Sequence, residues 1–402
     1  MSRSALSTAS GLGAAASLAL QGLLGLALVR YFPPDAVGVF SAINQVSFFW
    51  ATLALAQAPL RWLANARNAM PRSMQQTLSE VGTRLAYLAP LVLALLLATR
   101  PDDSAAIAIW SLLLALGQIG WQLAQSGALQ QAKAWGIFFT RISPHLVVLL
   151  GIAAVTALNG VCSTSWLLGL AVAGYAAGAL TLHGALRSPP GAALAGPAST
   201  QADTRSTALR LLHSAMDAAA MLVLLLVWAR SYGDAATGQL GVALRLLGIV
   251  PVVVYSDWAQ VALAHGHAAL RGSLLAALAG VLLTLLAGLG GSAAIAQGLV
   301  APQWQALQDY LVPVMLWQCA ACLLAASSHM PFQSDSARFF SYAAIVYDLL
   351  LLALTLAPPA LALAWSPAQH LWALAGFSTL SLCALAALNY RHWQQAQRAR
   401  AV

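Results

Sequence analysis

The chain has 402 residues, of which 60% are hydrophobic and 7% are charged, and its formal net charge is +8. Soluble domains carry about 25% charged residues, so this composition excludes a soluble protein and predicts a multi-pass integral membrane protein. Phosphate-binding loops, nucleophile elbows and extramembrane carboxylate pairs do not occur in the sequence. We therefore predict a protein that is not an enzyme and that uses no cofactor and no bound metal.

Apolar stretches of about 18 to 25 residues recur along the whole chain, and each can cross a hydrocarbon core about 30 Å thick. The first half contains six of them, at 9–29, 37–60, 82–99, 105–127, 135–157 and 165–186. The second half contains six more, at 208–229, 237–264, 272–295, 306–327, 339–360 and 366–389. The sequence thus predicts an all-α fold of about twelve transmembrane helices.

One connection is longer than the others and is rich in Pro, Gly, Ala and Ser, a composition typical of flexible linkers. It divides the chain into an N-terminal six-helix lobe at 1–187, a cytoplasmic linker at 188–205 and a C-terminal six-helix lobe with a basic tail at 206–402. We expect the two lobes to move relative to each other.

Two short breaks between apolar runs resemble each other at an offset of 200 residues, Arg30–Gly38 and Arg230–Gly238. Such a repeat predicts that one ancestral half has been used twice. Duplicated bundles of membrane helices are typical of secondary transporters, whose substrate path lies between the halves.

Basic residues indicate the orientation, because short loops rich in Arg and Lys stay in the cytoplasm. If the N-terminus is inside, the outer loops receive only Arg30, Arg100 and Arg230, and the inner loops receive the other basic loop residues. We therefore expect both termini in the cytoplasm and both repeat turns on the outer face. These charges serve topology and contact anionic membrane lipids, so no nucleic-acid partner is expected.

The first of these turns, with the sequence Phe32-Pro-Pro-Asp-Ala-Val-Gly38-Val-Phe40, resembles the turn after the first helix of polysaccharide exporters and lipid-linked oligosaccharide flippases. These proteins belong to the multidrug/oligosaccharidyl-lipid/polysaccharide exporter superfamily. The second copy keeps a glycine of the family turn, Gly233, where the first has Pro33. The resemblance implies a MATE-like fold of two six-helix lobes related by a pseudo-two-fold axis along the membrane normal.

Charged residues inside the membrane usually line an aqueous path, because burying an ionised group is costly. Arg141 and His145 lie one turn apart on one face of the fifth predicted helix, and Arg245 lies deep in the eighth. Guanidinium groups bind phosphate through paired hydrogen bonds, so these residues suit an anionic substrate. The alternative is that each arginine pairs with a carboxylate or extends to the interface.

Neutral polar residues could bind sugar hydroxyl groups. Gln45 is the counterpart of Arg245 at the 200-residue offset, and Asn44 adjoins it. Gln118 and Gln122 belong to a polar stripe on the fourth predicted helix, which either lines a cavity or holds two helices together.

Acidic residues inside the predicted helices occur only in the second half, where Asp217 and Asp348 lie well within their helices. A buried carboxyl group can take up a proton or coordinate a cation, so these two residues predict a site for coupling to H⁺ or Na⁺. The alternative is a salt bridge to Arg210 or Arg245 that serves packing alone.

The resemblance and the basic residues together predict a flippase of the bacterial inner membrane that serves surface polysaccharide biosynthesis, including lipopolysaccharide. Its substrate would be an undecaprenyl-diphosphate-linked oligosaccharide, and other polysaccharide assembly proteins are expected partners. Two alternatives stay open: a cation-coupled multidrug exporter of the same superfamily, and a membrane-embedded polysaccharide polymerase or ligase. The peptidoglycan-precursor flippases are less favoured, because that branch generally carries two further helices.

Overall fold

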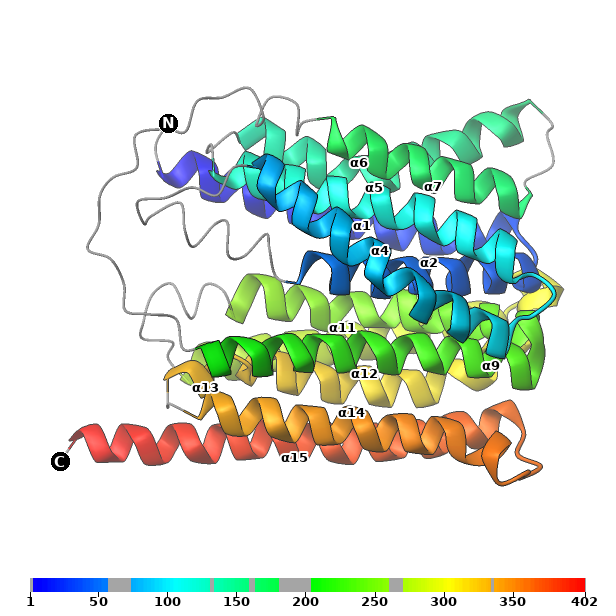
Figure 1. Cartoon of the computed structure of the whole chain (residues 1–402). Coiled ribbons are helices and arrows are strands. Elements are labelled where there is room, and N and C mark those ends of the chain that lie inside the picture. The colour runs from blue at the N-terminus through cyan, green and yellow to red at the C-terminus, as the bar shows by residue number, and fades with distance from the viewer. Residues whose placement is uncertain are drawn as a thin grey trace. The chain divides into compact units, whose positions relative to one another are not determined.

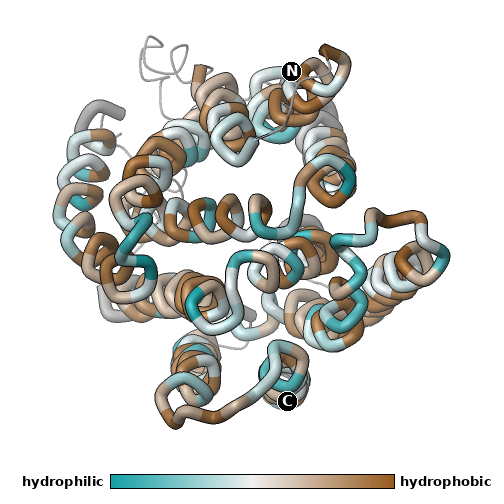
Figure 2. Tube along the Cα trace, turned by 90° about the vertical axis from the view of Figure 1, so that its right-hand side faces the viewer, coloured by the Kyte–Doolittle hydropathy of each residue, from teal (hydrophilic) through white to brown (hydrophobic). Residues whose placement is uncertain are grey.

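The structure is a computed structural model that describes residues 3–56, 74–130, 134–158, 163–180, 204–259, 270–333 and 336–401. All regular elements in these residues are helices (Figure 1). Inside a bilayer every backbone polar group must find a partner within the protein, and a helix satisfies these groups locally. Hydrophobic residues occur along the helices, and several of the turns at the end facing the viewer in Figure 2 are hydrophilic.

Contacts divide the chain into two compact units, each described here by itself. The N-terminal unit is Met1–Phe32 with Val39–Thr207, and the C-terminal unit is Pro33–Gly38 with Ala208–Val402. The predicted linker at 188–205 lies almost wholly outside the described residues, which resume at residue 204.

Six helices lie in the described residues of the N-terminal unit. They are α1 (Arg3–Tyr31), α2 (Pro34–Leu55, whose first turn belongs to the other unit), α4 (Met74–Thr99), α5 (Ser104–Gln130), α6 (Ala134–Ala157) and α7 (Thr164–Ala179). Helix α6 packs against both α1 and α7, and α5 packs against α7. The α6–α7 contact is close because two glycines of α7 face α6: a Cβ atom on Gly174 would lie 2.6 Å from the carbonyl oxygen of Pro144.

The C-terminal unit contains the remaining elements. They are α9 (Thr204–Val253), the π-helix η1 (Val254–Ala259), α11 (Leu270–Ala296), the 3-10 helix η2 (Pro302–Leu307), α12 (Gln308–Ser327), α13 (Met330–Gln333), α14 (Ala337–Ala360) and α15 (Pro367–Ala401). Helix α12 packs against both α11 and α15, and α14 packs against α15.

Local sequence signals explain several helix ends. Helix α11 ends in a Schellman motif, in which Gly298 has φ 70° and the Leu299 N–H donates to the Ala294 carbonyl at 2.9 Å. Helix α15 begins with a capping box, because the Ser366 N–H donates to Gln369 Oε1 and the Gln369 N–H donates to Ser366 Oγ.

The prediction of twelve membrane helices is confirmed. In the described residues nine helices are long and apolar enough to cross a membrane, and two shorter apolar helices, Ala15–Tyr31 and Thr164–Ala179, accompany them. One of the nine, the 43-residue Leu211–Val253, is broken at Gly233, which has φ 86° and ψ 171°. Residues other than glycine rarely adopt this conformation. Helix α9 therefore consists of two of the predicted helices, which meet at a kink at Gly233.

Several helix ends differ from the prediction: α2 ends at Leu55 instead of residue 60, α7 ends at Ala179 instead of residue 186, and the longest extensions are those of α4 and α15. Helix α4 begins at Met74 instead of residue 82, and α15 runs to Ala401 instead of residue 389. The prediction placed these ends where the apolar residues stop, but Gln, Ala and Arg are good helix formers outside the bilayer as well. Two ring contacts support the extension of α15, Tyr390 with Trp393 and His392 with Phe339 of α14, at 6.4 and 5.1 Å between centroids.

The two repeat turns contact each other within the C-terminal unit. A Cβ atom on Gly38 would collide with the carbonyl oxygen of Asp234, and one on Gly238 would collide with the carbonyl oxygen of Pro34. Each glycine thus meets the residue four positions before the other glycine. The contact is symmetric under the 200-residue offset, as expected for a pseudo-two-fold axis that passes between the two turns.

Candidate transport site

Asp348 is a buried acid in the middle of α14, with 3% of its surface exposed. Among the described residues its Oδ2 atom has no hydrogen-bond partner. Asp217 of α9 is close enough for the two carboxyl groups to repel each other electrostatically. The structure therefore brings together the two acids that the sequence selected.

Hydroxyl groups adjoin this acidic pair. The Tyr347 hydroxyl donates to Ser378 Oγ of α15 at 3.1 Å, and the Tyr347 ring stacks on Phe377 at 5.8 Å between centroids. We refer to Asp217, Asp348, Tyr347 and Ser378 as the acidic cluster.

A histidine lies beside Asp217 on the same helix. His213, one turn earlier in α9, interacts electrostatically with the Asp217 carboxyl group. Its ring also meets Phe340 of α14 edge-on at 6.0 Å between centroids. His213 and Asp217 therefore share one face of α9, and the side chain of Arg210 lies outside the described residues.

The acidic cluster has the chemistry of a site for a proton or a monovalent cation. No ion pair joins Asp348 to a basic side chain within the described ranges. An isolated buried carboxylate costs several kcal/mol, so Asp348 is suited to holding either a proton or a bound cation. Carboxylate and hydroxyl oxygens are ligands that hard cations prefer.

In the N-terminal unit, a small polar network joins α5 to α2. Gln118 Nε2 donates to Ser47 Oγ at 3.1 Å and to Asn44 Oδ1 at 3.5 Å, and the Ser47 hydroxyl donates to the Asn44 carbonyl at 2.7 Å. Gln118 and Ser47 are buried, whereas Asn44, Gln45 and Gln122 are half-buried. Gln118 thus connects two helices and orients the Asn44 amide.

The predicted basic pair lies on α6. Arg141 and His145 are both half-buried, and Pro144 precedes His145 inside the helix. The Arg141 stem passes α1 at Gly13, where an added Cβ atom would lie 3.4 Å from Arg141 Cδ. The third predicted basic residue, Arg245, is half-buried in the C-terminal unit, in the part of α9 that follows Gly233.

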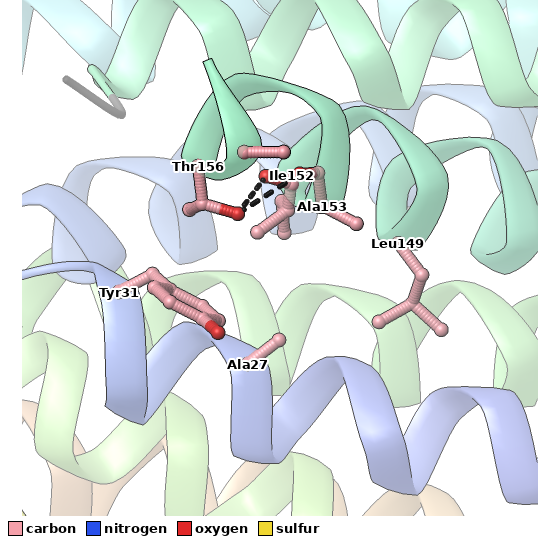
Figure 3. A pocket seen from close by; sticks show the side chains of 7 residues that line it. Ala27, Tyr31, Leu149, Ile152, Ala153 and Thr156 are labelled. Atoms are coloured by element: carbon pink, nitrogen blue, oxygen red, sulfur yellow. Dashed lines mark hydrogen bonds between the residues drawn. The ribbon is translucent and has the colours of Figure 1, made fainter. Parts of the chain in front are cut away.

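A separate groove lies between α1 and α6, with a volume of about 400 Å³. Figure 3 shows Tyr31 and Ala27 of α1 on one side and Leu149, Ile152, Ala153 and Thr156 of α6 on the other. The Thr156 hydroxyl donates to carbonyl oxygens of its own helix at 2.9 and 3.0 Å. The groove is mainly apolar, and none of the predicted substrate-binding residues lines it.

Sequence reasoning selected the acids and the amides but missed the hydroxyl groups beside them. Serine, the residue type of Ser47 and Ser378, is common in membrane helices and therefore carries little information by itself. Ser47 has one usable signal, since it follows Asn44 by three residues and therefore shares its helix face.

No protein-family model matches the chain, and no curated protein matches it. The chain is similar to several solved structures, and two of them are described here. A structure described as lipid II flippase MurJ in an inward closed conformation matches over 97% of this chain and 89% of that chain, with a TM-score of 0.60 and 11% identity. A multidrug resistance MATE family transporter of the MOP superfamily, inward-facing, matches over 99% and 96%, with a TM-score of 0.49 and 12% identity. The first likeness shows that the chain has the fold of a membrane flippase.

Proposed function

We propose that this protein is a flippase of the exporter superfamily named above, and that it moves a lipid-diphosphate-linked oligosaccharide across the bacterial inner membrane. The observation that carries this proposal is the fold, which matches a lipid II flippase over nearly the whole chain. The sequence adds the repeat turn and the basic residues inside the helices. The proposed transport serves surface polysaccharide biosynthesis, and it involves no chemical reaction on the sugar.

In this proposal the substrate meets basic and amide side chains from the two lobes, 1–187 and 206–402. Arg141, His145 and Arg245 bind the diphosphate, because guanidinium and imidazolium groups donate strong hydrogen bonds to phosphate oxygens. Amide groups bind sugar hydroxyls: Asn44, Gln45 and Gln122 do so directly, and Gln118 holds Asn44 in place through the bond at 3.5 Å. The lipid tail stays in the bilayer.

The energy source in this proposal is an ion gradient that acts through the acidic cluster. Asp217 and Asp348 would take up H⁺ or Na⁺ in one conformation of the lobes and release it in the other. The repulsion between the two carboxyl groups supports this role, because a proton or cation shared by the pair relieves it.

The orientation belongs to the proposal as well. Both termini and the 188–205 linker lie in the cytoplasm, and the repeat turns face the periplasm, as the distribution of basic residues predicts. Alternating access would then arise from rocking of the two lobes, as is usual in transporters built from repeats.

The test is mass spectrometry of lipid-linked sugars in inner-membrane vesicles from a deletion strain. The strain is complemented with the wild type, Arg141→Ala, Arg245→Ala or, as a matched control, Arg84→Ala, whose guanidinium pairs with Glu80 at 3.0 Å in a partly exposed position. We expect a diphosphate-linked oligosaccharide to accumulate on the cytoplasmic face in the strains with Arg141→Ala or Arg245→Ala. It should not accumulate in the strains with the wild type or the control. If lipid II accumulates instead, this protein moves the substrate named for the structural relative. If neither lipid-linked precursor changes in amount, both assignments are refuted.

A cation-coupled multidrug exporter is the second candidate, and the acidic cluster is the observation that favours it. Cationic drugs are attracted to carboxyl groups inside the membrane, and the cluster has two of them, the buried Asp348 and the exposed Asp217. Drug susceptibility of the same strains separates the two functions: an exporter would lower susceptibility only while Asp217 and Asp348 are intact.

A further inference from the structure

A cluster of aromatic rings surrounds His370, a fully buried residue in the first turn of α15. Trp228 of α9 stacks on the His370 ring, with 5.0 Å between centroids and 28° between planes. Tyr232 of α9 and Trp365 lie edge-on to the same ring at 5.9 and 5.8 Å. The imidazole is thus enclosed at one end of the C-terminal unit, next to the second repeat turn.

Both ring nitrogens of His370 are engaged. His370 Nε2 lies 3.3 Å from the Leu354 carbonyl of α14, and Nδ1 lies 3.1 Å from the Tyr232 hydroxyl. A carbonyl can only accept, so Nε2 carries the proton and Nδ1 accepts from the Tyr232 hydroxyl. His370 therefore connects α14 to the last residue before the break in α9.

Gly233 follows Tyr232 directly and has φ 86°, which side chains with a Cβ atom rarely adopt. Its carbonyl accepts from the Thr237 hydroxyl at 2.9 Å. Asp234, the next residue, supplies the carbonyl oxygen that contacts Gly38. The orientation of the Asp234 carbonyl therefore depends on the backbone conformation of Gly233. Gly233 lies between Tyr232 and Thr237, whose side chains are both held by hydrogen bonds.

The first repeat turn is built differently. At the 200-residue offset Gly233 corresponds to Pro33, and Asp234 corresponds to Pro34. Proline fixes φ near −65°, so this turn has little freedom, whereas glycine can change between several conformations at small cost. Tyr232 corresponds to Phe32, which has no hydroxyl group, so the hydrogen bond between Tyr232 and His370 has no counterpart in the first half.

We propose that Tyr232 and His370 form a latch that holds Gly233 in its left-handed conformation, and that the second repeat turn is therefore the moving turn of the pair. Two prolines keep the first turn static. His370 acts through Tyr232 and is a positioning residue. Its role in a transport cycle rests on the function proposed above, but the latch itself does not.

Hydrogen exchange of the full-length protein in lipid nanodiscs tests the latch. Tyr232→Phe removes only the hydroxyl, and we expect about fivefold faster exchange of the amides at 233–238, the factor that loss of one typical hydrogen bond gives. The amides at 35–38 of the first turn should not change. Tyr390→Phe is the matched control, because it removes a hydroxyl that accepts from Gln394 in the same unit.

A second variant separates the latch from general loosening. His370→Gln, alone and combined with Tyr232→Phe, forms a double-mutant cycle, and we expect the two effects to be strongly non-additive. Equal acceleration in both turns, no acceleration in Tyr232→Phe, or additive effects would overturn the proposal. If His370→Gln does not fold, the exchange rates of the two turns in Tyr232→Phe still decide whether the latch exists. Local exchange that changes as expected in a protein without flippase activity would uphold the latch and refute the proposed function.

Discussion

Asp348 combines two properties that conflict in a membrane helix, since its side chain is ionisable and only 3% of its surface is exposed. Its Oδ2 atom lacks a partner in the described residues, and the Asp217 carboxyl group repels it. Such an arrangement lowers stability and is kept where a function needs it. We therefore expect that removing the charge of Asp348 changes stability and function in opposite directions.

Asp348→Asn keeps the shape of the side chain and removes its charge. We expect an unfolding free energy about 1 kcal/mol higher than that of the wild type, because the repulsion from Asp217 and the cost of burying a charge both disappear. Ion-coupled transport should be lost. Thermal unfolding in detergent and transport in proteoliposomes with and without a gradient measure the two effects. Asp309→Asn, at an exposed position, is the control, and a less stable Asp348→Asn protein would contradict the prediction.

The sequence identifies Asp217 and Asp348 because charges are rare in apolar runs. It does not reveal that they approach each other, since 131 positions separate them and only the fold of the C-terminal unit, in which His213 of α9 also meets Phe340 of α14, brings them together. The polar stripe on α5 shows the same limit. Spacing places Gln118 and Gln122 on one face, but only the structure shows that Gln118 is buried against Ser47 whereas Gln122 is half-buried.

At the scale of elements, small residues determine how closely two helices approach. The packing of α7 against α6 depends on Gly174, whose hydrogen atoms face the Pro144 carbonyl of α6. Gly169 lies in the same helix, and an added Cβ atom there would meet nothing within 4 Å. One helix therefore offers a critical glycine and a matched control.

Gly174→Ala should destabilise the protein by about 1–3 kcal/mol, because the added methyl group meets backbone atoms that cannot turn aside. Gly169→Ala should stabilise it by about 0.5–1 kcal/mol, since alanine is the better helix former. Thermal unfolding of the two variants under identical detergent conditions decides the matter. Equal effects of the same sign would show that helix propensity and not the contact with α6 determines the outcome.

His329 lies in the connection between α12 and α14 and contacts both α11 and η1. It is buried, with Nε2 3.5 Å from Ser273 Oγ of α11, and the Trp258 ring of η1 lies edge-on at 6.2 Å. Trp258 Nε1 also donates to Ser273 Oγ at 3.2 Å. Burial disfavours the charged imidazolium, so it lowers the pKa of His329 below its ordinary value of 6.5.

This lowered pKa predicts a pH dependence of stability. In the unfolded chain the imidazole takes up a proton near pH 6.5, whereas in the folded protein it does so only at a lower pH. The unfolded state thus binds more protons in this window, and the unfolding free energy falls as the pH drops below about 6.5. Thermal unfolding between pH 8 and pH 5 should show a smaller decrease for His329→Gln than for the wild type. Parallel curves would assign the decrease to other groups.

At the scale of the whole molecule, hydropathy predicts the helices well because the bilayer requires backbone bonds to close within each segment. The twelve apolar helices in the described part of the chain follow from apolar runs and from breaks at Pro, Gly and Asp. The sequence predicts such a break at Arg230–Gly238, and the kink in α9 lies inside it, at Gly233. The residue types do not reveal that Gly233 alone leaves the helical conformation.

The contact between the repeat turns yields the fourth prediction. Gly38→Ala and Gly238→Ala each push a methyl group against a backbone carbonyl of the other turn, so each should cost about 1–3 kcal/mol of unfolding free energy. Because the contact is symmetric, we expect the two costs to agree, and the double variant to cost less than their sum. Gly22→Ala, at a position with nothing within 4 Å, is the control. A large cost for only one of the two glycines would show that the contact is not symmetric.

The same contact bears on how the chain arose. Gly38 meets the residue four positions before Gly238, and Gly238 meets the residue four positions before Gly38, so the surface is complementary to itself. Surfaces of this kind join identical subunits about a two-fold axis. Two separate copies of one ancestral half could have associated through this turn before their genes were fused, and the fused chain then let one copy replace the glycine of the turn by Pro33 while the other kept it as Gly233.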